Sequence, residues 1–143
     1  MGTLWEQYVF QRGAGANELW ERLFEDRPIR LLYIAGSGFD VRAQSVMREC
    51  ISSIKSSGGR VDEAKLVLIT FPGYQLDDGL RTLTEQNDLE LAALFSDFGL
   101  VERVAFGASD SDNDLSASIS LRLGTDAVLE RVAGQTDIIL DAS

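Results

Sequence analysis

The chain has 143 residues, of which 23 are acidic and 13 are basic, so its formal net charge is −10; it contains one cysteine and no histidine. This length is enough for one domain with a real core, and the 45% hydrophobic content is typical of a globular chain. The missing histidine excludes a Ser–His or Cys–His nucleophile pair and a His/Cys zinc site within the chain. The acidic balance repels nucleic-acid backbones, so we expect no coating of nucleic acid.

The negative charge is unevenly distributed. Residues 1–60 carry a net charge of +1 and residues 61–143 carry −11. All but two of the basic residues are arginine, whose fork binds phosphate and carboxylate well, although genomic base composition also explains a high arginine share. Binding of a small anionic ligand by residues 1–60 is therefore compatible with the net charge of −10.

The cysteine content and the apolar runs suggest a compartment. A single cysteine, Cys50, cannot form an internal disulfide, which favours a reducing environment. The first residues lack the basic end and apolar run of a signal peptide, and apolar runs such as 31–35 and 66–69 are too short to cross a bilayer. We therefore expect a cytoplasmic protein with no membrane contact.

The first 28 residues predict a helical segment. Residues 4–10 indicate a short helix, and 12–15 form a break before a second helix, which we expect Asn17 to cap. This second helix carries an apolar stripe, formed by Leu19, Trp20, Leu23 and Phe24. We divide the chain into this N-terminal segment, 1–28, and an α/β domain, 29–143.

Strands and helices then alternate. Four apolar segments predict buried strands at 29–35, 65–71, 101–107 and 136–141. Helical periodicity predicts helices at 41–55, at 76–98 (as one long helix or two shorter ones) and at 116–132. We expect Gly99 to cap the second of these helices, Gly124 to weaken the third, and Cys50 to face the core. This order predicts an α/β fold, a Rossmann-like three-layer arrangement with a mostly parallel sheet of about four strands and flanking helices.

The last predicted strand ends at Asp141, two residues before the end of the sequence. In open α/β sheets, ligands bind at the carboxyl ends of the strands. We therefore expect a domain that is incomplete at its C-terminus, with a small protein that ends on a strand as the alternative.

The strongest motif is a glycine turn between the first predicted strand and the next helix. The candidate ligand-binding residues are Gly36, Ser37, Gly38, Phe39, Asp40 and Arg42. Backbone N–H groups in such a turn and the dipole of the following helix favour an anion, and the glycines permit close backbone approach. The dinucleotide fingerprint is incomplete, because Val41 replaces its third glycine and the second strand ends without an acidic residue. A tight turn with Asp40 as the helix cap is the alternative interpretation.

Candidates for chemistry are few. Carboxylates, tyrosine and lysine are the remaining acid–base groups, and Asp40 and Asp141 are the weak catalytic candidates. Arg42 lies in a first helical turn, where a structural salt bridge is less expected than at a helix C-terminus, so a phosphate or carboxylate contact is the competing role. Asp77 and Asp78 edge the same cleft, or simply form an acidic helix start.

A polar loop that begins at Asp110 resembles the opening of a calcium loop. An EF-hand needs glycine at the sixth position and glutamate at the twelfth, where this chain has Leu115 and Leu121. We therefore expect no metal site there.

The strand with its Gly-Ser-Gly-Phe-Asp-x-Arg turn, preceded by an Arg-Gly-containing helical stretch, covers residues 10–45. This segment resembles the N-terminal Rossmann-like module of uncharacterised bacterial proteins found near phage-defence genes. The resemblance implies a bacterial protein with a defence role and brings no catalytic residues with it.

Two functions follow from these features. The first is binding of a nucleotide or another anionic small molecule at Gly36–Arg42, with residues 71–74 and Asp141 at its edge. The alternative is a non-catalytic interaction or scaffold subunit of a larger bacterial assembly, since the chain lacks a full catalytic set and aromatic residues often anchor interfaces. The aromatic residues that motivate it are Trp5, Tyr8, Phe10, Trp20 and Phe24.

Overall fold

The computed structural model describes residues 14–72, 75–107 and 114–142. Its strands are β1 (Pro28–Gly36), β2 (Arg60–Thr70), β3 (Leu100–Ala105) and β4 (Asp137–Asp141). Its helices are α1 (Ala14–Phe24), α2 (Arg42–Ser56), α3 (Asp78–Ser96) and α4 (Asp114–Val132). The strands form one sheet in the order β3-β2-β1-β4, and every neighbouring pair is parallel. The predicted Rossmann-like α/β fold is confirmed.

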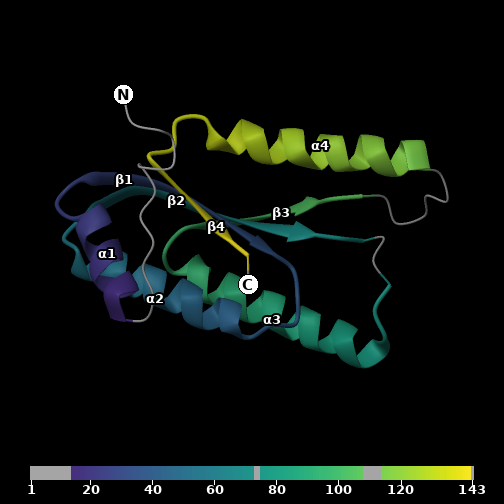
Figure 1. The fold of residues 1–143 in the computed structure, drawn as a ribbon, viewed down its shortest axis with the longest axis horizontal. Coiled ribbons are helices and arrows are strands. Elements are labelled where there is room, and N and C mark those ends of the chain that lie inside the picture. The colour runs from purple at the N-terminus through teal and green to yellow at the C-terminus, as the bar shows by residue number, and fades with distance from the viewer. Residues whose placement is uncertain (1–13, 73–74, 108–113, 143) are drawn as a thin grey trace.

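The helices cover the sheet in two layers. Figure 1 shows α4 on one face and α1, α2 and α3 on the opposite face. From β1 through β2 to β3 the sheet grows in one direction, while the connection from β3 returns across the sheet to β4. Right-handed crossovers then require the helix before β4 to lie on the face opposite α2 and α3.

The central strand β1 is buried on both faces, which explains its nearly continuous apolar sequence. Leu31 and Tyr33 belong to the core cluster under α2 and α3, and Leu32 and Ile34 belong to the cluster under α4. Cys50 of α2 is fully buried in the first cluster, so its predicted core position is confirmed.

The N-terminal helix α1 differs from its prediction at its start. It begins at Ala14, so Asn17 lies inside the helix and the predicted capping role is wrong. The Asn17 side chain instead donates to Glu49 Oε2 of α2 at 3.4 Å. Phe24 is buried in the core and Trp20 packs against it, so these two aromatic residues are committed to packing. The helix predicted at 4–10 lies outside the described residues, as does the calcium-like loop that begins at Asp110.

Two glycines are required by packing. Asp97 is the C-cap of α3, so the predicted cap position of Gly99 is wrong, although the Gly99 N–H donates to the Phe95 carbonyl of the last turn at 2.8 Å. A Cβ at Gly99 would lie 2.2 Å from the Ala64 carbonyl oxygen, which shows that Gly99 permits the chain to pass close to β2. Gly124 is buried inside α4, and a Cβ there would lie 2.5 Å from the Phe106 ring.

Strand β2 is longer than its apolar run. It begins at Arg60, five residues before its predicted start at Lys65, because its polar first half pairs with the beginning of β1. Residues 60–64 have neither an apolar run nor an apolar–polar alternation, so hydrophobic periodicity does not predict a strand there.

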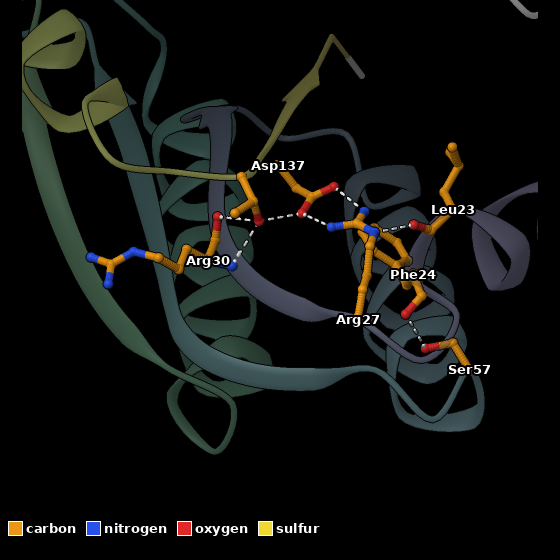
Figure 2. A network of polar contacts seen from close by, with 7 residues as sticks. Leu23, Phe24, Arg27, Arg30, Ser57 and Asp137 are labelled. Carbon is orange, nitrogen blue, oxygen red and sulfur yellow. Dashed lines mark hydrogen bonds and ion pairs between the residues drawn. The ribbon is translucent and has the colours of Figure 1, made fainter.

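A polar network ties the start of β4 to the turn before β1 (Figure 2). The Arg27 guanidinium donates from Nη1 to Asp137 Oδ2 at 2.8 Å and from Nη2 to Oδ1 at 2.5 Å, and its Nε donates to the Leu23 carbonyl. Thr136 Oγ1 accepts the Arg30 N–H at 2.9 Å and donates to Asp137 at 2.6 Å. Burial alone raises the pKa of Asp137. The hydrogen bonds from Arg27 and Thr136, together with the charge of Arg27, lower it by more than burial raises it, so the pKa of Asp137 lies below its usual value.

Candidate functional site

The predicted glycine turn lies at the carboxyl edge of the sheet, where β1 ends between β2 and β4. Gly36 is the last residue of β1, and its neighbour Ala35 pairs with Asp141 of β4. The chain leaves β1 toward β2 on one side, while β4 lies on the other, which makes this position a topological switch point. Ligands of open α/β sheets bind at such a point. We call residues Gly36–Arg42 the site loop.

Ser37 anchors the site loop to two neighbouring elements. Its N–H donates to the Ile69 carbonyl of β2 at 2.7 Å, and its Oγ donates to Asp88 Oδ2 of α3 at 2.5 Å. Burial raises the pKa of Asp88 above its usual value. The hydrogen bond from Ser37, the charge of Arg103 and the Gly38 N–H lower this pKa, but by less than burial raises it. Asp88 Oδ1 is buried without a hydrogen-bond partner in the described part of the chain.

A buried asparagine on α3 holds the rest of the site loop. The Asn87 side chain is only 3% exposed; its Nδ2 donates to the Gly38 carbonyl at 2.7 Å, and its Oδ1 accepts from Gln44 at 2.7 Å. Sequence reasoning missed this residue. The sequence does contain a signal for it: Asn87 lies four positions before Leu91 and eight before Phe95, so it shares the buried face of the helix with them.

Asp40 and Arg42 bind each other. Asp40 Oδ1 accepts the Arg42 N–H at 2.9 Å, and the Arg42 Nε donates to Asp40 Oδ2 at 2.8 Å. The N-cap position of α2 is Val41, so the predicted position of Asp40 as N-cap is wrong by one residue, although its carboxylate does bind the first helical amide. The position of Arg42 in a first helical turn makes a structural salt bridge less expected than a ligand contact. The salt bridge is nevertheless present, because the turn brings residues two apart into contact.

The hydrogen bonds and charge of Arg42 lower the pKa of Asp40, so Asp40 is a carboxylate at neutral pH. A carboxyl group of this kind is a poor general acid and a weak base. Its geometry therefore favours a structural role in the turn over proton transfer.

The site loop presents free amides beside the start of α2. The N–H groups of Phe39, Asp40 and Val41 donate no hydrogen bond to any residue in the described ranges. They lie at the positive end of the helix dipole, which favours negative charge. This arrangement is a candidate cradle for one anionic group.

A hollow of about 120 Å³ opens beside the site loop. It is lined by Ser37, Gly38, Phe39, Phe71, Leu76 and Thr84. Phe39 and Phe71 are 51% and 48% exposed, which is unusual for large apolar side chains at one place. Thr84 lines the hollow, but its Oγ1 is buried from solvent and has no hydrogen-bond partner among the described residues, so the accessible walls of the hollow are mainly aromatic.

The structure separates the predicted site residues into two groups. Ser37, Gly38 and Phe39 line the hollow together with Phe71, which we predicted to edge the site. The other predicted residues do not line it: Gly36, Asp40, Arg42 and Asp141. Of the side chains that follow Phe71, Asp77 caps α3 by accepting the Leu80 N–H at 2.8 Å, which confirms the acidic helix start. Tyr74 lies outside the described residues.

Asp141, the last residue of β4, accepts a hydrogen bond from a side chain of β1. The fully buried Tyr33 donates its hydroxyl to Asp141 Oδ2 at 2.7 Å. Burial and this bond raise the pKa of Tyr33, so the tyrosine keeps its proton as a donor. Burial and the nearby Asp141 charge raise the pKa of Cys50 to about 12, which excludes a reactive thiolate at neutral pH.

The described ranges contain no cluster of three or more His, Cys, Asp or Glu side chains that would hold a metal ion. Within the same ranges, no helix has the length and apolar character to cross a membrane.

The fold and this site together define a Rossmann-like α/β domain with a glycine turn and an aromatic hollow at its carboxyl edge. Comparisons with protein-family models, with curated proteins and with solved structures found no match. What this domain binds is therefore inferred from the geometry of the site.

Proposed function

We propose that this domain binds a nucleotide or a similar anionic small molecule at the site loop. The observation that carries the proposal is the open space at Gly36 and Gly38, where a Cβ would meet no atom within 4 Å and where neither glycine has a positive φ. By contrast, a Cβ at Gly59 or Gly99 would lie 2.4 Å or 2.2 Å from a backbone oxygen. Neither the backbone conformation nor packing requires glycine at positions 36 and 38, whereas close approach of a ligand does.

The hollow fits the ring of such a ligand. Its volume of about 120 Å³ is below the roughly 300–1,000 Å³ of whole-ligand pockets, so it accepts only one part of a ligand. The exposed rings of Phe39 and Phe71 offer apolar surface to a planar base. The Ser37 hydroxyl donates to Asp88, so it would accept a hydrogen bond from the edge of that base.

The charges of the site loop limit the anionic part of the ligand. The free amides beside α2 attract one anionic group, while the Asp40 carboxylate repels a larger charge. Arg42 lies mostly in solvent and is free to exchange Asp40 for a phosphate. A monophosphate therefore fits this loop better than a triphosphate.

The proposal includes a cellular setting, namely a bacterial cytoplasm, and a role in defence. The lone buried thiol of Cys50 is compatible with a reducing bacterial cytoplasm. The resemblance of the site loop to modules found near phage-defence genes supports a defence role.

Isothermal titration calorimetry with AMP, ADP, NAD and cyclic AMP tests the proposal. Gly38→Val should fold normally, because its side chain enters open space, and should weaken binding of the responsive nucleotide at least tenfold. Ala93→Val, an exposed helix position of α3, is the matched control and should bind like the wild type. Absence of heat with every nucleotide, or wild-type affinity in Gly38→Val, would overturn the proposal.

A second candidate function is the interaction subunit, and β4 is the element that favours it. Ile138 and Leu140 of this edge strand are 48% and 74% exposed, on the face that α4 covers elsewhere in the sheet. Exposed apolar edge strands are sites of pairing with other chains. Light scattering after size exclusion distinguishes the two functions: a monomer that stays soluble at high concentration and binds a nucleotide contradicts the subunit.

A further inference from the structure

A larger hollow, of about 310 Å³, lies between the second half of α2 and the C-terminal end of α3. It shares no lining residue with the hollow at the site loop. Its apolar floor is formed by Ile51 of α2 and by Leu94 and Phe98, which pack against the core and remain partly exposed. We call this surface the α2–α3 groove.

Two basic side chains border the groove along α2. Arg48 and Lys55 are seven residues apart, so they lie on one face of the helix about 10 Å from each other along its axis. Ser52 lies between them on the same face, where its small side chain leaves room for close approach.

These two cations are among the described basic residues that form no salt bridge, as are Arg22, Arg103 and Arg122. Neither Arg48 nor Lys55 forms a salt bridge with a described residue, and neither donates a hydrogen bond to one. The basic residues that do form salt bridges are Arg27, Arg30, Arg42, Arg60, Lys65, Arg81 and Arg131. The charges of Arg48 and Lys55 are therefore available to a partner, although Asp97 also lines the groove and reduces its net positive charge.

We propose that the α2–α3 groove binds an acidic amphipathic helix of a partner protein. Two carboxylates seven residues apart on such a helix would match the spacing of Arg48 and Lys55, and apolar residues between them would contact Leu94 and Phe98. The overall charge of −10 repels an acidic partner from most of the surface, so the paired cations set where it binds. This inference does not depend on nucleotide binding.

The test uses a synthetic helical peptide with two glutamates seven residues apart and leucines between them, added to the ¹⁵N-labelled full chain. The expected result is a set of amide shifts confined to α2 and α3, with affinity at least tenfold higher than that of the same peptide with glutamines, and falling as salt rises. The double variant Arg48→Glu/Lys55→Glu should lose this binding. Arg122→Glu, an exposed basic position on α4, is the matched control and should retain it.

Equal affinity for the glutamate and glutamine peptides, or unchanged binding by the double variant with a wild-type circular dichroism spectrum, would overturn the proposal. A dimer of the free chain that is dissociated by the double variant would also overturn it, because the groove would then be occupied by a second copy.

Discussion

The salt bridge between Arg27 and Asp137 holds the edge strand β4 against the turn that precedes β1, although the two residues are 110 positions apart. Asp137→Asn removes the charge and half of the two-bond fork while it keeps the size of the side chain. The two side chains are 35% and 16% exposed, so solvent screens the pair only partly. Hydrogen bonds to charged groups contribute roughly 1.5–3 kcal/mol, and after a discount for exposure we expect a loss of about 2 kcal/mol.

This loss is measurable by thermal and urea unfolding. For a chain of this size, about 2 kcal/mol corresponds to a fall in Tm of roughly 4–8 °C. Asp62→Asn is the matched control, since Asp62 pairs with Arg60 at the surface, where the solvent screens the charges; it should leave the Tm unchanged within error.

A double-mutant cycle isolates the pair itself. Asp137→Asn, Arg27→Gln and the double variant should reveal a coupling free energy of about 1–2 kcal/mol. If the two single losses simply add, or if Asp137→Asn costs no more than Asp62→Asn, this pair does not anchor β4.

Three further results are expected. Because the pKa of Asp137 lies below its usual value in the folded chain, its stabilisation is complete above about pH 5 and is lost as pH falls through the folded pKa. The Tm gap between wild type and Asp137→Asn should therefore shrink from pH 6 to pH 2.5, and a constant gap contradicts this. Gly124→Ala should destabilise the fold by about 1–3 kcal/mol in urea unfolding, since its Cβ would lie 2.5 Å from the Phe106 ring, whereas a neutral effect would mean that α4 does not pack as described. Cys50 should resist thiol reagents in the native state and react only after unfolding, because burial raises its pKa to about 12; rapid native labelling contradicts this.

The order of elements was predictable because burial leaves a strong pattern in the sequence. Strand β1 carries apolar residues on both faces, and that is visible as an apolar run between Pro28 and Gly36. The beginning of β2 was not predictable, since its polar residues are held by pairing with β1 rather than by burial.

The site was predictable only in its local part. Ser37, Gly38 and Phe39 form the turn and are adjacent in sequence, so a motif identifies them. Asn87 and Asp88 reach the same turn from about 50 residues away, and only tertiary packing brings them there.

The glycines illustrate the same limit. Gly99 and Gly124 serve contacts with β2 and with the Phe106 ring, which no local pattern records. Their predicted roles as a cap and as a weak point of a helix followed from propensity, whereas their positions are set by the close approach of another element.

Nucleotide binding by the site loop is the function proposed for this domain. The most direct test is an NMR titration of the ¹⁵N-labelled chain with the same four nucleotides. The proposal predicts saturable amide shifts at Gly36–Arg42 and Phe71 with one of them, and their loss in Gly38→Val. Unchanged spectra at millimolar nucleotide, or shifts confined to other surfaces, would contradict it.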